Sequence, residues 1–149
     1  MRATSSLVAG LFLAVVLGCS SVTPVAIRAG DICEQCRRAI ADTKIASEIA
    51  PPAGRLALKF DRVTCMARYL AQHAETPGAV LVTDYTTGRL IQARSAVFVK
   101  GEIDPNTKAR DYFAFGDVKE AVAFNQKSGG GGVVVDWPAI RSQVAAAAD

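Results

Sequence analysis

Sulfur side chains are the residues of this sequence whose type and spacing could do chemistry. Cys33 and Cys36 form a C-x-x-C pair, and the dipeptide Cys65–Met66 follows further along the chain. Two intervening residues let both thiols of such a pair turn toward one point, which suits a metal ion at thiolate bond lengths or a small-loop disulfide. We therefore treat Cys33, Cys36, Cys65 and Met66 as a candidate metal site. The alternative is that they are ordinary core residues, because cysteine and methionine are often buried.

The ligand types favour a soft metal ion. Three thiolates and a thioether suit Cu(I). A structural zinc site requires four Cys or His ligands, and the sequence has one histidine, His73. In a helix, His73 would lie roughly 12 Å from Cys65 along the axis, which is too far for one site. The sequence therefore favours Cu(I) over zinc.

Thiol–disulfide exchange is the second possible use of the cysteines. A C-x-x-C pair with a third cysteine could shuttle electrons in an oxidising compartment, although the pair does not lie in the strand–helix context of a thioredoxin-like motif. Arg37 and Arg38 follow the pair, and their charges would lower the pKa values of the thiols.

Other function classes have little support in the sequence. No serine, histidine and acid group at useful spacing and no phosphate loop is present, so we expect a binding protein and not an enzyme. The net charge of +3 without a run of like charges, together with few aromatic residues, argues against a nucleic-acid partner.

The N-terminus predicts export and lipidation. Arg2 and the apolar run 7–17 are typical of a secretory signal, and Val16-Leu17-Gly18-Cys19 resembles a lipobox. We expect residues 1–18 to be a lipoprotein signal peptide and Cys19 to carry the lipid anchor; the alternative is a plain secretory signal. Residues 19–30 are expected to form a flexible tether. Ser20, next to the lipidated cysteine, resembles the signal that sorts lipoproteins to the outer membrane. The predicted location is therefore the periplasmic side of a bacterial outer membrane.

The elements that must position these residues begin with the helix that carries Cys65 and Met66. It is expected to run from Asp61, as N-cap, to His73. The positive end of the helix dipole would favour the thiolate of Cys65. The strands expected around this helix are residues 40–49, 55–60 and 79–85.

The second half repeats the first in outline. Asp117 and Glu120 form a capping box before a second helix, and the polar stretch 102–110 is interpreted as a loop. The expected strands are residues 90–93, 96–100, 112–115 and 133–137, followed by a terminal helix over 139–148. These repeats indicate an internal duplication. The predicted fold class is α+β, with two related ββαβ units over residues 31–88 and 89–149 plus a C-terminal helix. The first unit holds Cys33, Cys36 and Cys65.

Several motifs together resemble the NosL family of copper-binding lipoproteins accessory to nitrous oxide reductase. The motifs are the lipobox, the C-x-x-C pair, Phe60-Asp61 followed by Cys65-Met66 and Tyr69-Leu70, Asp84-Tyr85-x-x-Gly88, Ala114-Phe115, and the glycine–valine strand near the C-terminus. The resemblance implies a fold related to organomercurial lyase and delivery of Cu(I) to an envelope copper enzyme, most directly nitrous oxide reductase.

Two positions depart from the family pattern. Family members often read Cys-x-x-Cys-Gly-Met, whereas Arg37-Arg38 follows Cys36 here, and many carry Pro-Met where this chain has Pro105-Asn106. Both changes move the expected site toward thiolate ligands. A more thiolate-rich site would hold Cu(I) harder, which is compatible with storage or with a different client.

Overall fold

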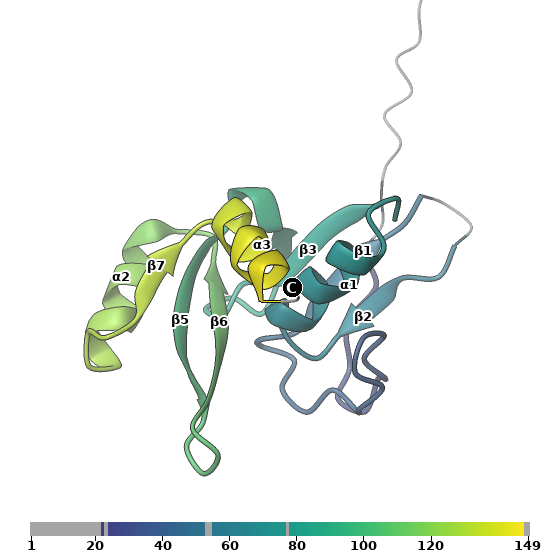
Figure 1. Cartoon of the computed structure of the whole chain (residues 1–149). Coiled ribbons are helices and arrows are strands. Elements are labelled where there is room, and N and C mark those ends of the chain that lie inside the picture. The colour runs from purple at the N-terminus through teal and green to yellow at the C-terminus, as the bar shows by residue number, and fades with distance from the viewer. Residues whose placement is uncertain (1–21, 23, 53–54, 77, 148–149) are drawn as a thin grey trace, which may run out of the picture.

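The computed structural model describes residues 22, 24–52, 55–76 and 78–147 (Figure 1). Its elements, in chain order, are β1 (Ser47–Ala50), β2 (Leu58–Phe60), α1 (Val63–Gln72), β3 (Ala79–Thr83), β4 (Leu90–Gln92), the 3-10 helix η1 (Ala93–Ser95), β5 (Val97–Asp104), β6 (Ala109–Phe115), α2 (Val118–Lys127), β7 (Val133–Val135) and α3 (Trp137–Ala146). None of the helices within the described ranges has the length and apolar character needed to cross a bilayer. The expected signal peptide and Cys19 lie outside the described residues.

The strands form two antiparallel sheets, which confirms the predicted α+β class. The first sheet has the order β2-β1-β3-β4 and the second has the order β6-β5-β7. In each sheet the first strand of the unit lies between the second and the third, and a helix connects the second to the third. This is the ββαβ topology expected for each half; its origin in a duplication stays a prediction. β4 follows the predicted boundary at residue 88 in sequence but pairs with β3 in the first sheet.

One buried carboxylate joins the two sheets. Asp84 follows β3 and forms a parallel bridge with Ala114 of β6. Its Oδ2 accepts a hydrogen bond from the Gly116 backbone at 2.8 Å, and its Oδ1 accepts from Thr86 and Thr87 at 2.9 Å. The backbone of Gly88 closes the same turn with a positive φ of 70°, a conformation that favours glycine. The Asp-Tyr-x-x-Gly motif therefore has a structural role: it links the two sheets, and we call this link the joint.

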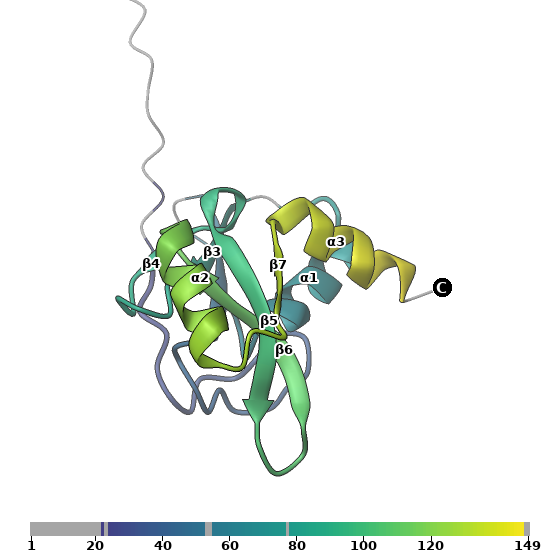
Figure 2. The same ribbon diagram turned by 90° about the vertical axis from the view of Figure 1, so that its left-hand side faces the viewer.

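The helices lie on both faces of the second sheet. Phe98 of β5 faces the core shared with α1 and α3, while Val99 and Phe113 face α2, as expected for alternating residues of a strand. Figures 1 and 2 show α2 on one side of β5 and β6, and α3 beside α1 on the other. The larger core therefore combines residues of both halves.

Several local expectations are corrected by the structure. Asp61 is not the N-cap of α1: Arg62 holds that position without a side-chain cap, and the carboxylate of Asp61 binds the Arg62 guanidinium at 2.9 Å. The carboxylate of Asp111, in β6, instead accepts the backbone N–H of Thr64 at 3.2 Å. The polar stretch 102–110 is not a loop, because β5 and β6 extend through most of it as a long hairpin. The helix predicted after Asp117 is confirmed as α2, with Asp117 as its N-cap, but among the described residues the Glu120 side chain does not complete the expected capping box.

The described part of the expected tether lies against the first sheet. The backbone N–H of Val25 donates to Glu48 Oε1 at 2.9 Å, and Lys59 Nζ donates to the carbonyl of Ala26 at 2.9 Å. Ile27 packs against the main core. Residues 25–27 are therefore held against the sheet, because two strand side chains hydrogen-bond their backbone groups.

Candidate metal centre

A short hairpin-like loop presents the C-x-x-C pair. Ile32 and Ala39 form an antiparallel bridge, and the backbone N–H groups of Cys33 and Arg37 donate to the carbonyls of Arg38 and Cys33, each at 2.9 Å. Arg37 has a positive φ of 60°, which lets the chain turn back within the loop. These bonds fix the backbone on both sides of Cys36.

The loop is attached to the strand that leads into α1. The backbone N–H of Glu34 donates to the carbonyl of Lys59 in β2 at 2.8 Å, and Lys59 Nζ forms an ion pair with Asp31 at 2.7 Å. Three residues after β2, α1 begins at Val63, and Cys65 lies in its first turn. The loop and the start of α1 are thus held at the same end of the first sheet.

This arrangement brings three cysteines together. The Sγ atoms of Cys33, Cys36 and Cys65 all lie within 4.8 Å of one another, and the three thiols are free. Cys33 is 0% exposed and Cys65 is 6% exposed, while Cys36 is only partly buried. The residues that the sequence singled out for a thiolate site are therefore neighbours in space.

The thiol of Cys36 is held toward its ionised form. Burial raises its pKa, but the backbone N–H and the guanidinium of Arg38 and the thiols of Cys33 and Cys65 outweigh burial and lower the pKa. Of the two arginines expected to act on the thiols, Arg38 does so, whereas Arg37 forms an ion pair with Glu34 at 2.9 Å.

The expectation for Cys65 in the metal-free protein is wrong. Burial and the charges of Cys33 and Cys36 raise its pKa far above the ordinary thiol value. The start of the helix therefore does not outweigh burial and the neighbouring thiols, which hold Cys65 toward its neutral form.

Met66 is placed differently from the cysteines. It is 0% exposed and packs in the main core, and unlike Cys36 and Cys65 it does not line the cleft beside the thiols. Its part as a metal ligand stays a prediction. His73 ends α1, where its ring stacks on Tyr69 with centroids 4.2 Å apart and its Nδ1 lies 3.0 Å from the Tyr69 carbonyl.

A cleft of about 730 Å³ opens beside the thiols. It lies between the C-x-x-C loop, α1, the β5–β6 hairpin and α3. The basic residues that line it are Arg38, Arg62, Arg68, Lys100 and Arg110. Sequence reasoning missed this cleft because its walls come from both halves. The available signal was the pair Arg62 and Arg68, at and just after the start of the first helix.

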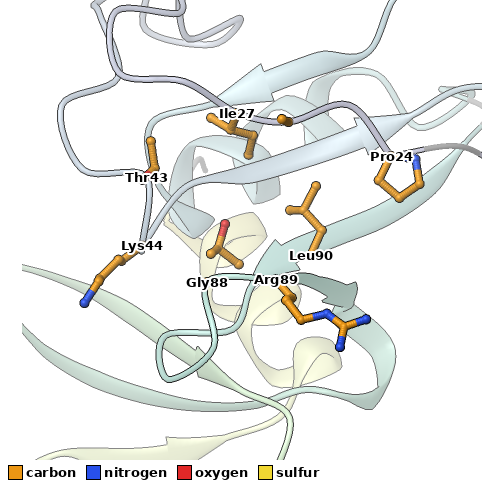
Figure 3. Close-up of a pocket in the computed structure, with 9 residues that line it drawn as sticks. Pro24, Ile27, Thr43, Lys44, Gly88, Arg89 and Leu90 are labelled. Atoms are coloured by element: carbon orange, nitrogen blue, oxygen red, sulfur yellow. The ribbon is translucent and has the colours of Figure 1, made fainter.

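A second hollow lies on the first sheet, where residues 24–27 meet the β3–β4 hairpin. It measures about 400 Å³, and its lining contains no thiol, imidazole or carboxylate among the described residues. Figure 3 shows its two basic side chains, Lys44 and Arg89, extending away from each other. This hollow has no group of side chains suited to metal chemistry.

Fold and site together define a small two-sheet α+β protein with a candidate thiol metal centre. A family model described as NosL matches residues 24–145, and the chain belongs to the NosL family. The solved structures include a similar fold, the crystal structure of the copper chaperone NosL from Shewanella denitrificans, with 20% sequence identity and a TM-score of 0.64. The match covers 79% of this chain and 95% of that chain. No curated protein matches the sequence.

Proposed function

We propose that this protein binds one Cu(I) ion through the thiolates of Cys33, Cys36 and Cys65 and delivers it to a copper enzyme. The observation that carries the proposal is the separation of the three Sγ atoms, all within 4.8 Å of one another. With metal–sulfur bonds of about 2.3 Å, a trigonal ion holds its sulfur ligands about 4 Å apart. A small contraction of the thiol group would therefore make a three-coordinate site.

The charge around the thiols fits a monovalent soft ion. Three thiolates and Cu(I) leave two negative charges, which need compensation where water is excluded. Arg38 contacts Cys36, and Arg62 lines the same cleft as Cys65. Met66, the next residue of α1, is proposed as a weaker fourth ligand.

The cellular role follows from the family and from the N-terminal sequence. The similar solved structure is described as a copper chaperone, and the family resemblance points to nitrous oxide reductase as the client. The proposed protein is a carrier, anchored through a lipid on Cys19 to the periplasmic side of the outer membrane. Because the two methionines common in the family are missing here, the alternative form of this proposal is copper storage or delivery to another client.

A thiol–disulfide redox function is the second candidate. Cys36 combines a lowered pKa with partial exposure, which is the environment of a reactive thiol. In that case Cys33 and Cys36 would be indispensable, Cys65 would be largely dispensable, and the metal-free protein would exchange disulfides.

A Cu(I) titration against a chromogenic competitor, run anaerobically with and without Zn(II), separates the two functions. We expect one Cu(I) per chain with a dissociation constant far below micromolar. Cys65→Ser should weaken binding as strongly as Cys33→Ser, by at least about 100-fold, because even the loss of an outer-shell partner costs 10- to 100-fold.

Met66→Leu is the matched control, because it conserves volume in the same turn of the helix. It should lower the affinity only modestly. Wild-type binding no tighter than micromolar, or a Cys65→Ser curve that overlays the wild type, would reject the copper site in favour of the redox function.

A further inference from the structure

The cleft beside the thiols has an unusual balance of charge. Five cationic side chains and a single carboxylate, that of Asp111, line it within the described part of the chain, whereas the whole chain has 17 lysines and arginines against 14 acidic residues. The carboxylate is 2% exposed and accepts the backbone N–H groups of Thr64 and Tyr112. The free surface of the cleft is therefore positive.

Three of these cations, Arg68, Lys100 and Arg110, have no anionic partner among the described residues, whereas Arg38 contacts the thiol of Cys36. Over the described ranges, Arg62 is the one member of the five that pairs with a carboxylate, that of Asp61. Arg68 and Arg110 are exposed, and Arg110 donates only to the carbonyl of Lys100, at 3.1 Å. Lys100 lies over the ring of Tyr112, with Nζ 5.4 Å from the centroid. Like charges gathered in one hollow repel one another and attract an anionic occupant.

The cleft also gives access to the metal site. Cys36 and Cys65 line it, while Cys33 is wholly buried behind them. A ligand that takes the metal from the thiols by this route must lie in the cleft. The residues that line the cleft come from α1 of the first half and from β5, β6 and α3 of the second. Figure 1 shows these elements next to one another.

We propose that this basic cleft docks an acidic polypeptide segment of the protein that exchanges copper with the thiols. This inference rests on the proposed copper-carrying function. In the exchange, a bond forms between Cu(I) and a sulfur of the partner while the bond to Cys36 breaks. The ion stays Cu(I), and the released thiolate remains beside Arg38.

The shape of the cleft favours a polypeptide over other anions. The cleft has a volume of about 730 Å³, which exceeds the need of a single phosphate group. Its cations Arg68, Lys100 and Arg110 come from α1, β5 and β6 and so could contact successive acidic residues of one extended segment. The cations also line a concavity, whereas a lipid surface is contacted by cations on an exposed, outward face.

The test uses the copper-free mature protein and a synthetic probe, acetyl-Glu-Asp-Glu-Met-Glu-Asp-Glu-amide, in isothermal titration calorimetry. The control peptide has Gln and Asn in place of Glu and Asp. We expect the acidic peptide to bind, the neutral one not to bind, and the affinity to fall as salt screens the charges.

The variant Arg68→Glu/Arg110→Glu changes two cations that are not proposed ligands. It should weaken peptide binding at least tenfold while leaving Cu(I) stoichiometry unchanged. The matched control, Arg89→Glu/Arg94→Glu, changes the net charge equally at two exposed arginines outside the cleft, and should change the affinity less than twofold.

Three results would overturn the docking proposal: equal weakening by both double variants, equal binding of both peptides, or no binding at millimolar peptide. Inorganic phosphate that competes in the low millimolar range would assign the cleft to a small anion instead. The non-lipidated protein can also be sedimented with anionic phospholipid vesicles. If it binds them, and Arg68→Glu/Arg110→Glu abolishes that binding, the cleft would be assigned to a lipid surface. If the protein still binds one Cu(I) ion in the titration, the proposed copper-binding function holds even when the docking proposal fails. The failure of one proposal can therefore be told from the failure of the other.

Discussion

The three clustered cysteines carry the same functional group but differ in their access to solvent. Cys33 is wholly buried and Cys65 nearly so, while Cys36 is partly exposed in the basic cleft. These differences predict different parts for the three residues in the proposed metal exchange. In the proposed copper exchange, we expect an external ligand to reach Cys36 first, with Cys33 and Cys65 retaining the ion while one bond is exchanged.

Alkylation tests this order of access. Limited iodoacetamide treatment of the reduced, metal-free protein, followed by peptide mass spectrometry, should modify Cys36 at least about tenfold faster than Cys33 or Cys65, because only an exposed thiolate reacts readily. Cu(I) loading should protect all three. Modification of Cys65 as fast as Cys36 would contradict this order of access.

Glu48 is a charged residue that the folded protein accommodates poorly. It is 0% exposed in β1; its Oε1 accepts the N–H of Val25, and its Oε2 has no hydrogen-bond partner among the described residues. Burial raises its pKa above the usual 4.5, although the Val25 N–H and the charge of Lys59 oppose the shift. The protonated form is therefore favoured by folding.

The sign of the pH effect follows from linkage. With a raised folded pKa, the stability that Glu48 contributes is fully present below pH 4.5 and is lost as the pH rises through the folded value. Glu48→Gln should therefore raise the free energy of unfolding at pH 7 by about 1 kcal/mol, the usual size of such a buried polar defect. Urea unfolding of both proteins from pH 4 to pH 8 measures the difference. A gain that does not shrink toward pH 4 would contradict the explanation.

At the scale of elements, the joint between the two sheets depends on Asp84. Burial raises its pKa, but the N–H groups of Thr87, Gly116 and Thr86 outweigh burial and lower the pKa below the usual 3.8. Asp84→Ala removes the acceptor for these three groups. We expect a loss of about 2–4 kcal/mol in the free energy of unfolding, since hydrogen bonds to a charged group contribute about 1.5–3 kcal/mol each and are not additive.

Asp104 supplies a matched control for this joint. It accepts the N–H groups of Asn106 and Thr107 and the Thr107 hydroxyl in the turn of the β5–β6 hairpin, but it is only partly buried and these hydrogen bonds stay within that turn. Asp104→Ala should cost less than about 1 kcal/mol. Because the folded pKa of Asp84 is lowered, its contribution is present above pH 3.8 and is lost as the pH falls through the folded value. Equal losses in the two variants at pH 7 would show that Asp84 is only a turn residue.

Local patterns predicted the elements that depend on local contacts. The capping signal at Asp117 and the apolar run of β3 were sufficient, because their partners lie within a few residues or on one strand face. The start of α1 was mispredicted since the carboxylate that accepts its Thr64 N–H belongs to Asp111 of β6. The hairpin arms over 102–110 were taken for a loop because their outer residues are polar. The three cysteines were predicted from residue type, but the cleft required tertiary structure.

On the scale of the whole molecule, the two halves share one large core. Phe98, Trp137 and Ile140 come from the second half and pack in the same cluster as Phe60 and Met66 from the first. The three clustered thiols therefore rest on a core that neither half completes alone.

Truncation tests this shared core. A fragment of residues 24–95 contains the whole first sheet and all three clustered cysteines, yet it should not unfold cooperatively, because a domain of this size is marginal even with an intact core. Thermal unfolding by circular dichroism and proton NMR dispersion provide the measurement, with the 24–147 protein as control. A dispersed spectrum with a cooperative transition would show that the first half is an independent domain.

The central claim is that one Cu(I) ion is held by the sulfur atoms of Cys33, Cys36 and Cys65. Copper X-ray absorption of the protein loaded with one equivalent of Cu(I) tests it most directly. We predict a Cu(I) edge and a first shell of at least three sulfur atoms at about 2.3 Å, reduced by one sulfur in Cys65→Ser. A shell of two sulfur atoms with nitrogen or oxygen, or a spectrum unchanged by Cys65→Ser, would contradict the account.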